Sequence, residues 1–209
     1  VSQIRFGDEA SANVGMLTYD HSDNSMAFRT SSTDQMRLTS SGDLSFTGGG
    51  GIVFGDAGAS GTPSPTSTSN TLDDYEEGSW SPEVADAQSA GNEGSATVTS
   101  ANYTKVGRQV TLSVQLTNIV TTGMISTSPF YVRNLPFTSM SNNFSSCAVK
   151  SDNLNFQGTR YNLYGQIGGN DTWVNLQVSG SGQAETNVDI NDITSGTTDI
   201  AFSITYFTA

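Results

Sequence analysis

Three segments in the second half of the chain alternate strictly between apolar and polar residues. They are RQVTLSVQLTN (108–118), TWVNLQV (172–178) and DIAFSITYF (199–207). In the first of them, the apolar residues Val110, Leu112, Val114 and Leu116 share one face. A period of two with one polar face is typical of antiparallel strands that bury one side. Because turn signals separate these strands, the pattern predicts a β-sandwich of jelly-roll type over residues 79–209.

The first 60 residues follow a different pattern. Short strand-like pieces, VGMLTYD, NSMAFRT, QMRLT and DLSF, are separated by the turn signals HSDN, SSTD and SSGD. The motif IRFGDEASA (4–12) returns as IVFGDAGAS (52–60). Strands with two or three apolar residues each cannot bury a core within one chain, so they require further repeats or identical chains as neighbours. The alternative is a small monomeric β-meander.

Composition supports an all-β fold. Ser and Thr are frequent, Gly occurs 22 times, and no segment shows a 3.6-residue apolar period. Residues 57–70 (AGASGTPSPTSTSN) contain no large apolar side chain and are predicted to be a linker or an extended surface strap. We therefore expect a repetitive β segment over 1–60, a linker with an acidic junction over 61–78, and the sandwich over 79–209.

The acidic junction is the densest charged stretch of the chain. In TLDDYEEGSW, four carboxylates occupy five positions: Asp73, Asp74, Glu76 and Glu77. Such a cluster could bind Ca²⁺, although calcium loops usually space their ligands at alternate positions. We favour a structural junction in which Leu72 and Tyr75 pack into the sandwich and the carboxylates face solvent.

Charge and residue counts exclude several functions. Eight basic against 20 acidic residues give a formal net charge of −12, which argues against nucleic acid and anionic membrane surfaces as partners. No apolar stretch is long enough for a membrane span. Cys147 is the only cysteine and His21 the only histidine, so neither a disulfide, a cysteine zinc site nor a His-based triad is available. We predict that the protein is not an enzyme.

Several motifs resemble bacteriophage tail fibres and related receptor-binding proteins. LDDYEEGSWSPEV (72–84), ANYTKVGRQVTLSVQL (101–116) and VRNLPFTS (132–139) look like the C-terminal domain of such fibres. VGMLTYDHSDNSMAFRT (14–30) and MRLTSSGDL (36–44) are similar to the shaft sequences that precede it. These motifs are distributed between residues 14 and 139, and their order agrees with that family.

The resemblance implies a homotrimer on the phage tail, with an intertwined shaft of short strands and a sandwich head that attaches the virion to a host cell. The expected partners are a host surface glycan or protein and upstream fibre or baseplate components. Two alternatives are a purely structural fibre or capsid decoration protein and a tailspike-like depolymerase. The depolymerase would require paired acids in a cleft or an activated nucleophile.

Aromatic residues in the predicted head supply the candidate binding site. Tyr161, Tyr164 and Trp173 could stack on sugar rings, with Asn162, Asn170 and Asp171 as hydrogen-bonding neighbours. The alternative is that Tyr164 and Trp173 fill a core or a subunit interface. Because the chain is acidic, a neutral glycan or a protein is a better receptor than an acidic polymer.

Overall fold

The fold is given by a computed structural model that describes residues 1–47, 52–53, 71–72, 75–156 and 158–208. The chain divides into two compact units, Val1–Asp73 and Asp74–Ala209, called here the N-terminal and C-terminal units. The described residues form strands and one 3-10 turn, η2 (Ile190–Asp192), without any α-helix. None of them belongs to a helix that could cross a membrane. The prediction of an all-β protein is confirmed.

The N-terminal unit is a five-stranded antiparallel meander in which each strand pairs with the next along the chain. Its strands are β1 (Ser2–Phe6), β2 (Gly15–Asp20), β3 (Ser25–Thr30), β4 (Thr33–Leu38) and β5 (Leu44–Phe46). They coincide with the short strand-like pieces expected from the sequence. A separate pair joins β6 (Ile52–Val53) to β7 (Thr71–Leu72). The GGGG run, the predicted linker over 57–70 and most of the second repeat copy lie outside the described residues.

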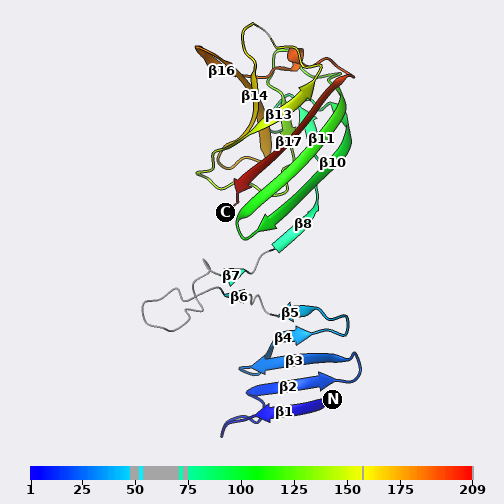
Figure 1. The fold of residues 1–209 in the computed structure, drawn as a ribbon, viewed down its shortest axis with the longest axis vertical. Coiled ribbons are helices and arrows are strands. Elements are labelled where there is room, and N and C mark those ends of the chain that lie inside the picture. The colour runs from blue at the N-terminus through cyan, green and yellow to red at the C-terminus, as the bar shows by residue number, and fades with distance from the viewer. Residues whose placement is uncertain (48–51, 54–70, 73–74, 157, 209) are drawn as a thin grey trace. The chain divides into compact units, whose positions relative to one another are not determined.

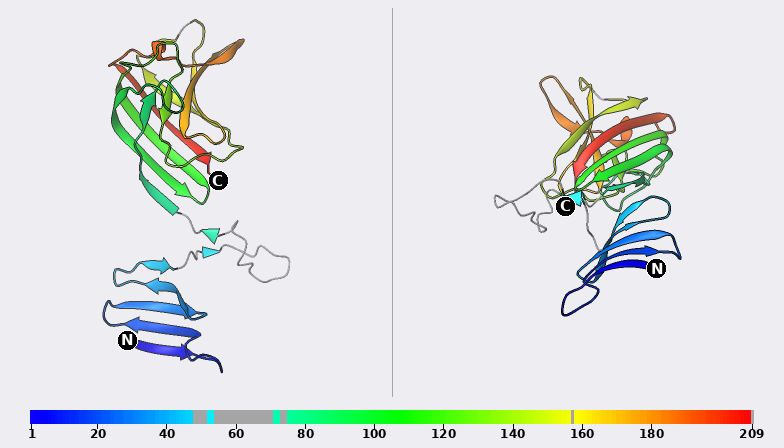
Figure 2. Two further views of the ribbon diagram at one scale, coloured as in Figure 1. Left: turned by 180° about the vertical axis from the view of Figure 1, so that it is seen from behind. Right: turned by 60° about the horizontal axis from the view of Figure 1, so that its bottom comes forward.

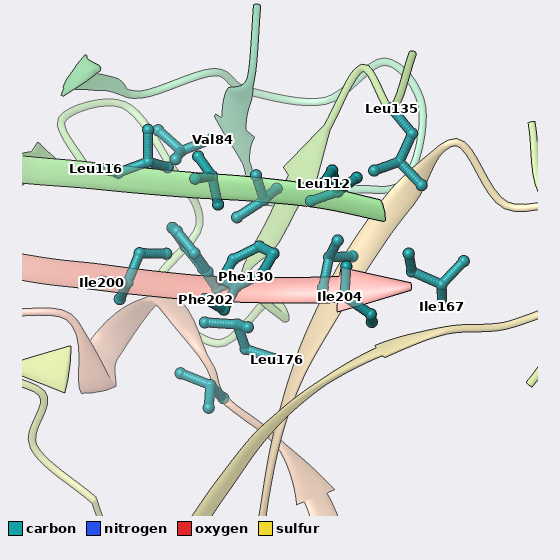
Figure 3. Packing of buried hydrophobic residues seen from close by; sticks show 14 of the residues in the cluster. Val84, Leu112, Leu116, Phe130, Leu135, Ile167, Leu176, Ile200, Phe202 and Ile204 are labelled. Carbon is teal, nitrogen blue, oxygen red and sulfur yellow. The ribbon is translucent and has the colours of Figure 1, made fainter. Parts of the chain in front are cut away.

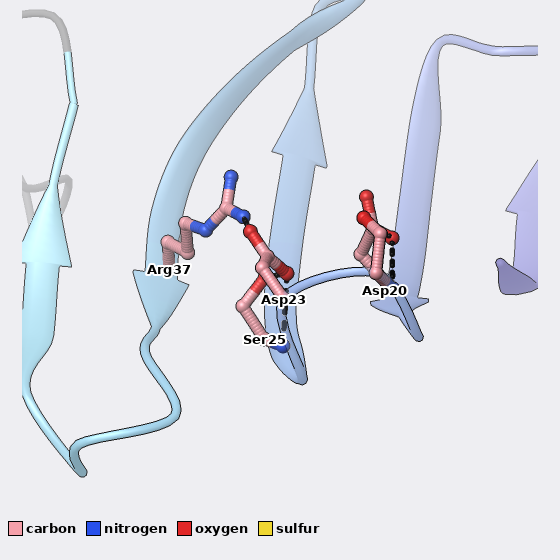
Figure 4. Close-up of polar contacts among 5 residues, drawn as sticks. Asp20, Asp23, Ser25 and Arg37 are labelled. Atoms are coloured by element: carbon pink, nitrogen blue, oxygen red, sulfur yellow. Dashed lines mark hydrogen bonds and ion pairs between the residues drawn. The ribbon is translucent and has the colours of Figure 1, made fainter.

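Short polar side chains hold the turn between β2 and β3 (Figure 4). The Asp20 carboxylate accepts hydrogen bonds from the hydroxyl and the backbone N–H of Ser22, which lower its pKa. In the same way Asp23 accepts from the hydroxyl and N–H of Ser25, and it forms an ion pair with Arg37 of β4. Asx turns of this kind fix a reversal without any apolar contact. His21 is exposed in this turn, as expected for a solvated residue.

One face of the meander carries a continuous row of apolar side chains. The strand registers align Ile4, Leu17, Phe28, Met36 and Phe46 across all five strands. At one edge Ile4 is 57% exposed, and at the other Phe46 is exposed as well. Every described residue of the large hydrophobic cluster belongs to the C-terminal unit. Within the described chain, a single sheet therefore leaves its apolar face without a second layer.

The C-terminal unit is one ten-stranded antiparallel sheet that curls on itself. Its strands follow the path β8-β10-β11-β17-β13-β14-β15-β12-β9, with β16 added beside β15. Their bounds are β8 (Tyr75–Ser79), β9 (Glu83–Ala85), β10 (Ser95–Val106), β11 (Gln109–Val120), β12 (Tyr131–Arg133), β13 (Ser145–Asp152), β14 (Asn162–Ile167), β15 (Trp173–Gly180), β16 (Gln183–Asn187) and β17 (Thr198–Phe207). Figures 1 and 2 show the long strands β10, β11 and β17 side by side in one layer.

Strand β13 forms the corner between the two layers. Its first half, from Ser145 to Ala148, pairs with β14, whereas its second half, from Val149 to Asp152, pairs with β17. At the other side, Gly94 beside β10 donates to the carbonyl of Val84 in β9. The sandwich-like class is confirmed. One strand, β13, continues the sheet around the corner between the two layers.

The apolar faces of the two layers enclose the core (Figure 3). Leu112 and Leu116 of β11 meet Leu176 of β15, with Phe130 between the layers. All four side chains are fully buried. Burying one such side chain contributes about 1.5–3 kcal/mol. The alternating faces predicted for β11, β15 and β17 are confirmed, since their apolar positions are the buried ones.

The acidic junction differs from its prediction. Tyr75–Ser79 form the edge strand β8, paired with β10, so the sheet already begins at Tyr75, four residues before the predicted boundary at 79. Tyr75 is 62% exposed, which makes its predicted role as a core anchor wrong. An edge strand that carries charge and little apolar surface is protected against pairing with other strands. Its residues do not alternate between apolar and polar, so the sequence pattern did not predict this strand.

Candidate functional site

The C-terminal unit has two distinct ends. At the proximal end, β8 begins at Tyr75 and β17 finishes at Phe207, since both residues align with the β10–β11 turn. At the distal end, β17 begins at Thr198 and the chain forms the β15–β16 hairpin and η2. Figure 1 shows β16 at the end of this unit that lies opposite β8 and the C-terminus.

The predicted ligand-binding residues do not form one cluster. Asn170 and Asp171 lie in the turn between β14 and β15, and Trp173 opens β15. Tyr161 and Asn162 stand at the other end of β14. A strand of six residues separates the two groups by about 20 Å. The prediction that these aromatic and amide residues form one site is therefore wrong.

The proximal group is occupied by contacts within the fold. The Asp171 carboxylate accepts the N–H of Gly168 at 2.6 Å, and burial raises its pKa. Ser139 accepts the N–H of Asp171 and donates to the carbonyl of Gly168. Trp173 packs edge-on against Tyr131 with 6.5 Å between ring centroids. These contacts fix the β14–β15 turn and give it a structural role.

Tyr164 is likewise tied to a neighbouring strand. It lies on the outer face of β14, and its hydroxyl donates to the carboxylate of Glu185 in β16. Burial, together with this carboxylate, raises the pKa of Tyr164 to about 12. The phenol therefore stays protonated at physiological pH and helps to hold β16 against the sheet.

A polar pocket opens at the distal end. Its volume is about 230 Å³, and its lining residues are Arg160, Val178, Thr186, Asn187, Asp189, Asn191 and Asp192. The walls come from the segment before β14, from β15 and β16, and from η2. Tyr161 directly follows Arg160, and the residue is 74% exposed. Its N–H donates to the carbonyl of Ser179, which extends the pairing of β14 with β15 by one residue. None of the predicted ligand-binding residues lines this pocket, and Tyr161 is the neighbour in sequence of one residue that does.

Asp192 is the most unusual group in the pocket wall. The residue is only 6% exposed, and one carboxylate oxygen, Oδ2, accepts the N–H of Asp189 at 3.0 Å. The other oxygen, Oδ1, is buried and has no hydrogen-bond partner among the described residues. Burial raises the pKa of Asp192. A buried acceptor left without a donor costs about 1–3 kcal/mol, so this oxygen lowers the stability of the free protein.

The remaining pocket groups complement this acceptor. Burial, and then the negative charge of Asp192, raise the pKa of Asp189. The guanidinium of Arg160 is positioned by its Nε, which donates to the carbonyl of Ala184 at 3.3 Å. Asn187 accepts from the amide of Asn175 at 2.9 Å, which fixes the orientation of its own amide. Val178 adds an apolar surface.

The mixture of groups indicates which ligand the pocket suits. A sugar presents hydroxyl donors and acceptors around an apolar ring face, and the pocket offers both kinds of partner beside Val178. A cation is less suited, because the guanidinium of Arg160 lies in the same wall. Throughout the described residues, no group of three or more His, Cys, Asp or Glu side chains could hold a metal ion.

The predicted calcium cluster can be followed only in part. Asp73 and Asp74 lie outside the described residues. Glu76 and Glu77 are consecutive in β8, so their side chains project to opposite faces of the sheet. Glu76 accepts the hydroxyl of Tyr103, and Glu77 accepts that of Tyr75 at 2.8 Å. Glu76 and Glu77 therefore do not converge on one ion.

Sequence reasoning missed the acids of the distal pocket. In VDINDI (188–193), Asp189 and Asp192 alternate with the buried residues Val188, Ile190 and Ile193. Acids embedded in an apolar run without strand periodicity are a signal of buried carboxylates. That signal could have directed attention to η2 before the structure was known.

No protein-family model, curated protein or solved structure matches this chain, so its function is argued from its residues and geometry. Two features of that geometry bear on function. One is the exposed apolar face of the N-terminal unit, and the other is the polar pocket at the distal end of the C-terminal unit.

Proposed function

We propose that this protein is a trimeric attachment protein of the bacteriophage tail-fibre type that binds a neutral glycan of the host surface. The observation that carries the proposal is the distal pocket, whose wall combines carboxylates, amides and a guanidinium with the apolar side chain of Val178. Sugar hydroxyls can donate to the carboxylates of this wall and accept from its amides and guanidinium, while the ring lies against the apolar surface. Tyr161 beside the pocket offers an exposed ring for stacking.

The position of the pocket supports this role. The C-terminal unit begins at Tyr75 on its proximal end, and the pocket is at the opposite end of the same unit. A receptor site at the end remote from the incoming chain is the arrangement that a fibre tip requires. The sequence motifs that resemble tail fibres point to the same function.

Assembly into a homotrimer is supported by the N-terminal unit. Its row from Ile4 to Phe46 is apolar on one face, and a monomer leaves these side chains in water. Covering apolar surface with a second layer contributes about 25 cal/mol per Å². Three identical chains can supply that layer to each other. Three pockets on one fibre would then strengthen weak single-site binding through avidity.

The charge of the chain favours an uncharged ligand. A formal charge of −12 per chain repels acidic polysaccharides at long range. The pocket adds two carboxylates at short range, partly offset by Arg160. Binding to a neutral glycan through hydroxyl hydrogen bonds and stacking depends little on ionic strength, because few counterions are displaced.

The test is binding of the full-length chain to an array of neutral and acidic glycans, with hits measured by titration calorimetry. Asp192→Asn keeps the shape but removes a negative charge from the pocket wall and replaces a carboxylate oxygen by a donor, and we expect at least about a tenfold loss of affinity, equal to 1.4 kcal/mol. The matched control is Asp171→Asn at the proximal end, which should leave binding unchanged. Equal binding by both variants and the parent would contradict the pocket assignment.

The same experiment separates the competing functions. A structural fibre or decoration protein would bind no glycan on the array and no host cells. A depolymerase would release reducing ends when incubated with the bound glycan. We expect binding without release.

A further inference from the structure

Part of the outer face of the long-stranded layer carries no charged side chain. Six side chains from three neighbouring strands form a grid, in two rows aligned by register: Asn102, Ser113 and Ser203, then Thr104, Thr111 and Thr205. All are exposed or half-buried. The register continues the second row from Thr104 to Glu77 on the edge strand β8, and this carboxylate borders the six residues. We call these six residues the uncharged face.

This face contrasts with the chain as a whole, which carries 20 acidic and eight basic residues. Depletion of charge is the compositional mark of the buried centre of a protein–protein interface. Two copies of a chain with net charge −12 repel each other over most of their surface. They can approach closely only where carboxylates are absent, so the uncharged face suits another copy better than it suits a charged partner.

The hydroxyl groups of the face are largely satisfied within the sheet. Thr111 and Thr205 share a hydrogen bond of 2.9 Å between their Oγ1 atoms, and Ser203 donates to the carbonyl of Leu112 at 3.0 Å. Covering these hydroxyls therefore forfeits fewer hydrogen bonds to water than covering unpaired ones. Short side chains also leave a shallow hollow of about 220 Å³, with Leu112 among its lining residues. A side chain from a second molecule can fill that hollow.

An apolar margin borders the face at the proximal end. Register aligns Tyr75 with Val106, Val106 with Gln109, and Gln109 with Phe207. Phe144, which precedes β13, is 77% exposed, and its neighbour Asn143 accepts the N–H of Phe207. Exposed aromatic side chains beside an uncharged sheet face add the apolar contact area that a stable interface needs.

We infer that the uncharged face, with this apolar margin, packs against another copy of the same chain. The inference rests on the proposed trimer, which the N-terminal unit would nucleate. Because the C-terminal unit is joined to the N-terminal unit at its proximal end, trimer formation raises the local concentration of C-terminal units around one another. The heads of the fibre are then held together by sheet faces, with their distal pockets left accessible.

Cysteine labelling of the full-length chain tests this contact. Ser113→Cys places a thiol at the centre of the face with minimal change of shape, in a Cys147→Ala background that removes the single native thiol. Ser181→Cys, in the exposed β15–β16 turn, is the matched control. Each maleimide reaction rate is divided by the rate of the same variant unfolded in urea, and the oligomeric mass of each sample is measured by light scattering.

In a trimer we expect Ser113→Cys to react at least about tenfold more slowly than Ser181→Cys, because interface cores pack like protein interiors. Ser113 is exposed in the isolated chain, so such protection must come from another copy. Equal rates in a sample with trimeric mass would overturn the contact and leave the trimer intact. A monomeric mass would overturn both. Thr104→Cys, also exposed on the face, replaces Ser113→Cys if that variant does not fold.

Discussion

The two units of this chain use the same antiparallel pairing but differ in what covers their apolar faces. In the N-terminal unit, Ile4 and Phe46 remain exposed on a single layer. In the C-terminal unit, the sheet turns through β13, and its two layers bury Leu116 and Phe130 completely. The difference teaches that alternation predicts a strand, whereas stability depends on whether the chain itself supplies the second layer.

Strand length explains the contrast. The strands of the meander have three to six residues, whereas β10 and β11 have 12 each. The eight-residue strand β13 bends and pairs with both layers, and the long strand β11 offers enough apolar positions to form a core. Short strands form a flat sheet whose apolar face must be covered by another molecule or remain in water.

The largest effect should come from the core of the C-terminal unit. Phe130→Ala removes a fully buried ring between the layers and should destabilise this unit by about 3–5 kcal/mol. Phe28→Ala in the meander is the matched substitution, and it should leave the melting of the C-terminal unit unchanged. Denaturant unfolding followed by tryptophan fluorescence measures both, since Trp80 and Trp173 both lie in this unit. A comparable loss for both variants would break the division into two units.

A charge on the apolar face should weaken assembly without unfolding the C-terminal unit. Ile4→Lys exchanges an apolar side chain in the row for a cation, which forfeits about 1.5–3 kcal/mol of burial per chain in the proposed trimer. Gln3→Lys is the control, because the adjacent residue of the same strand projects to the opposite face. Sedimentation velocity should show dissociation for Ile4→Lys only. Dissociation by both variants would mean that net charge, and not the apolar face, controls assembly.

A smaller effect concerns two buried aspartates of the C-terminal unit with opposite pKa shifts. Burial alone would raise the pKa of Asp86, but hydrogen bonds from Asn92 and the N–H of Ile125 outweigh it and hold the pKa below 3.8. Its stabilising contribution is therefore complete above pH 3.8 and is lost as pH falls through the lowered value. Asp192 has a raised pKa, so its charged form costs stability at neutral pH, and that cost declines as pH falls through the raised value toward the ordinary one.

Substitution by Asn should change the stability of the protein in opposite directions at these two positions. Asp86→Asn should destabilise the protein by about 1–2 kcal/mol at neutral pH, and by less as the medium is acidified below the ordinary pKa of the side chain. Asp192→Asn should be neutral or stabilising at neutral pH. Thermal melts across the acid range measure both differences. A parallel pH dependence of the two variants would contradict the assigned environments.

Much of the fold could be predicted from the sequence because its long strands alternate. β11, β15 and β17 each bury every second side chain, and this pattern is visible in the residues alone. β12 escaped prediction because its residues Tyr131, Val132 and Arg133 are all buried, so no alternation is present. β8 escaped because it is charged and exposed.

The candidate site was less predictable for a geometric reason. Aromatic and amide residues close in sequence were expected to act together, but a hairpin places Tyr161 and Trp173 at opposite ends of its strands. The pocket instead joins Arg160 to Asp189 and Asp192 through the pairing of β15 with β16. Long-range pairing of this kind is not encoded in local spacing.

The most direct test of the central claim is the mass of the full-length chain in solution. The account holds that the C-terminal unit is self-sufficient while the N-terminal unit needs other copies to cover its apolar face. Light scattering with size separation should therefore give three times the chain mass of 22.0 kDa. A 22.0 kDa monomer whose N-terminal sheet is protected from hydrogen exchange would contradict it.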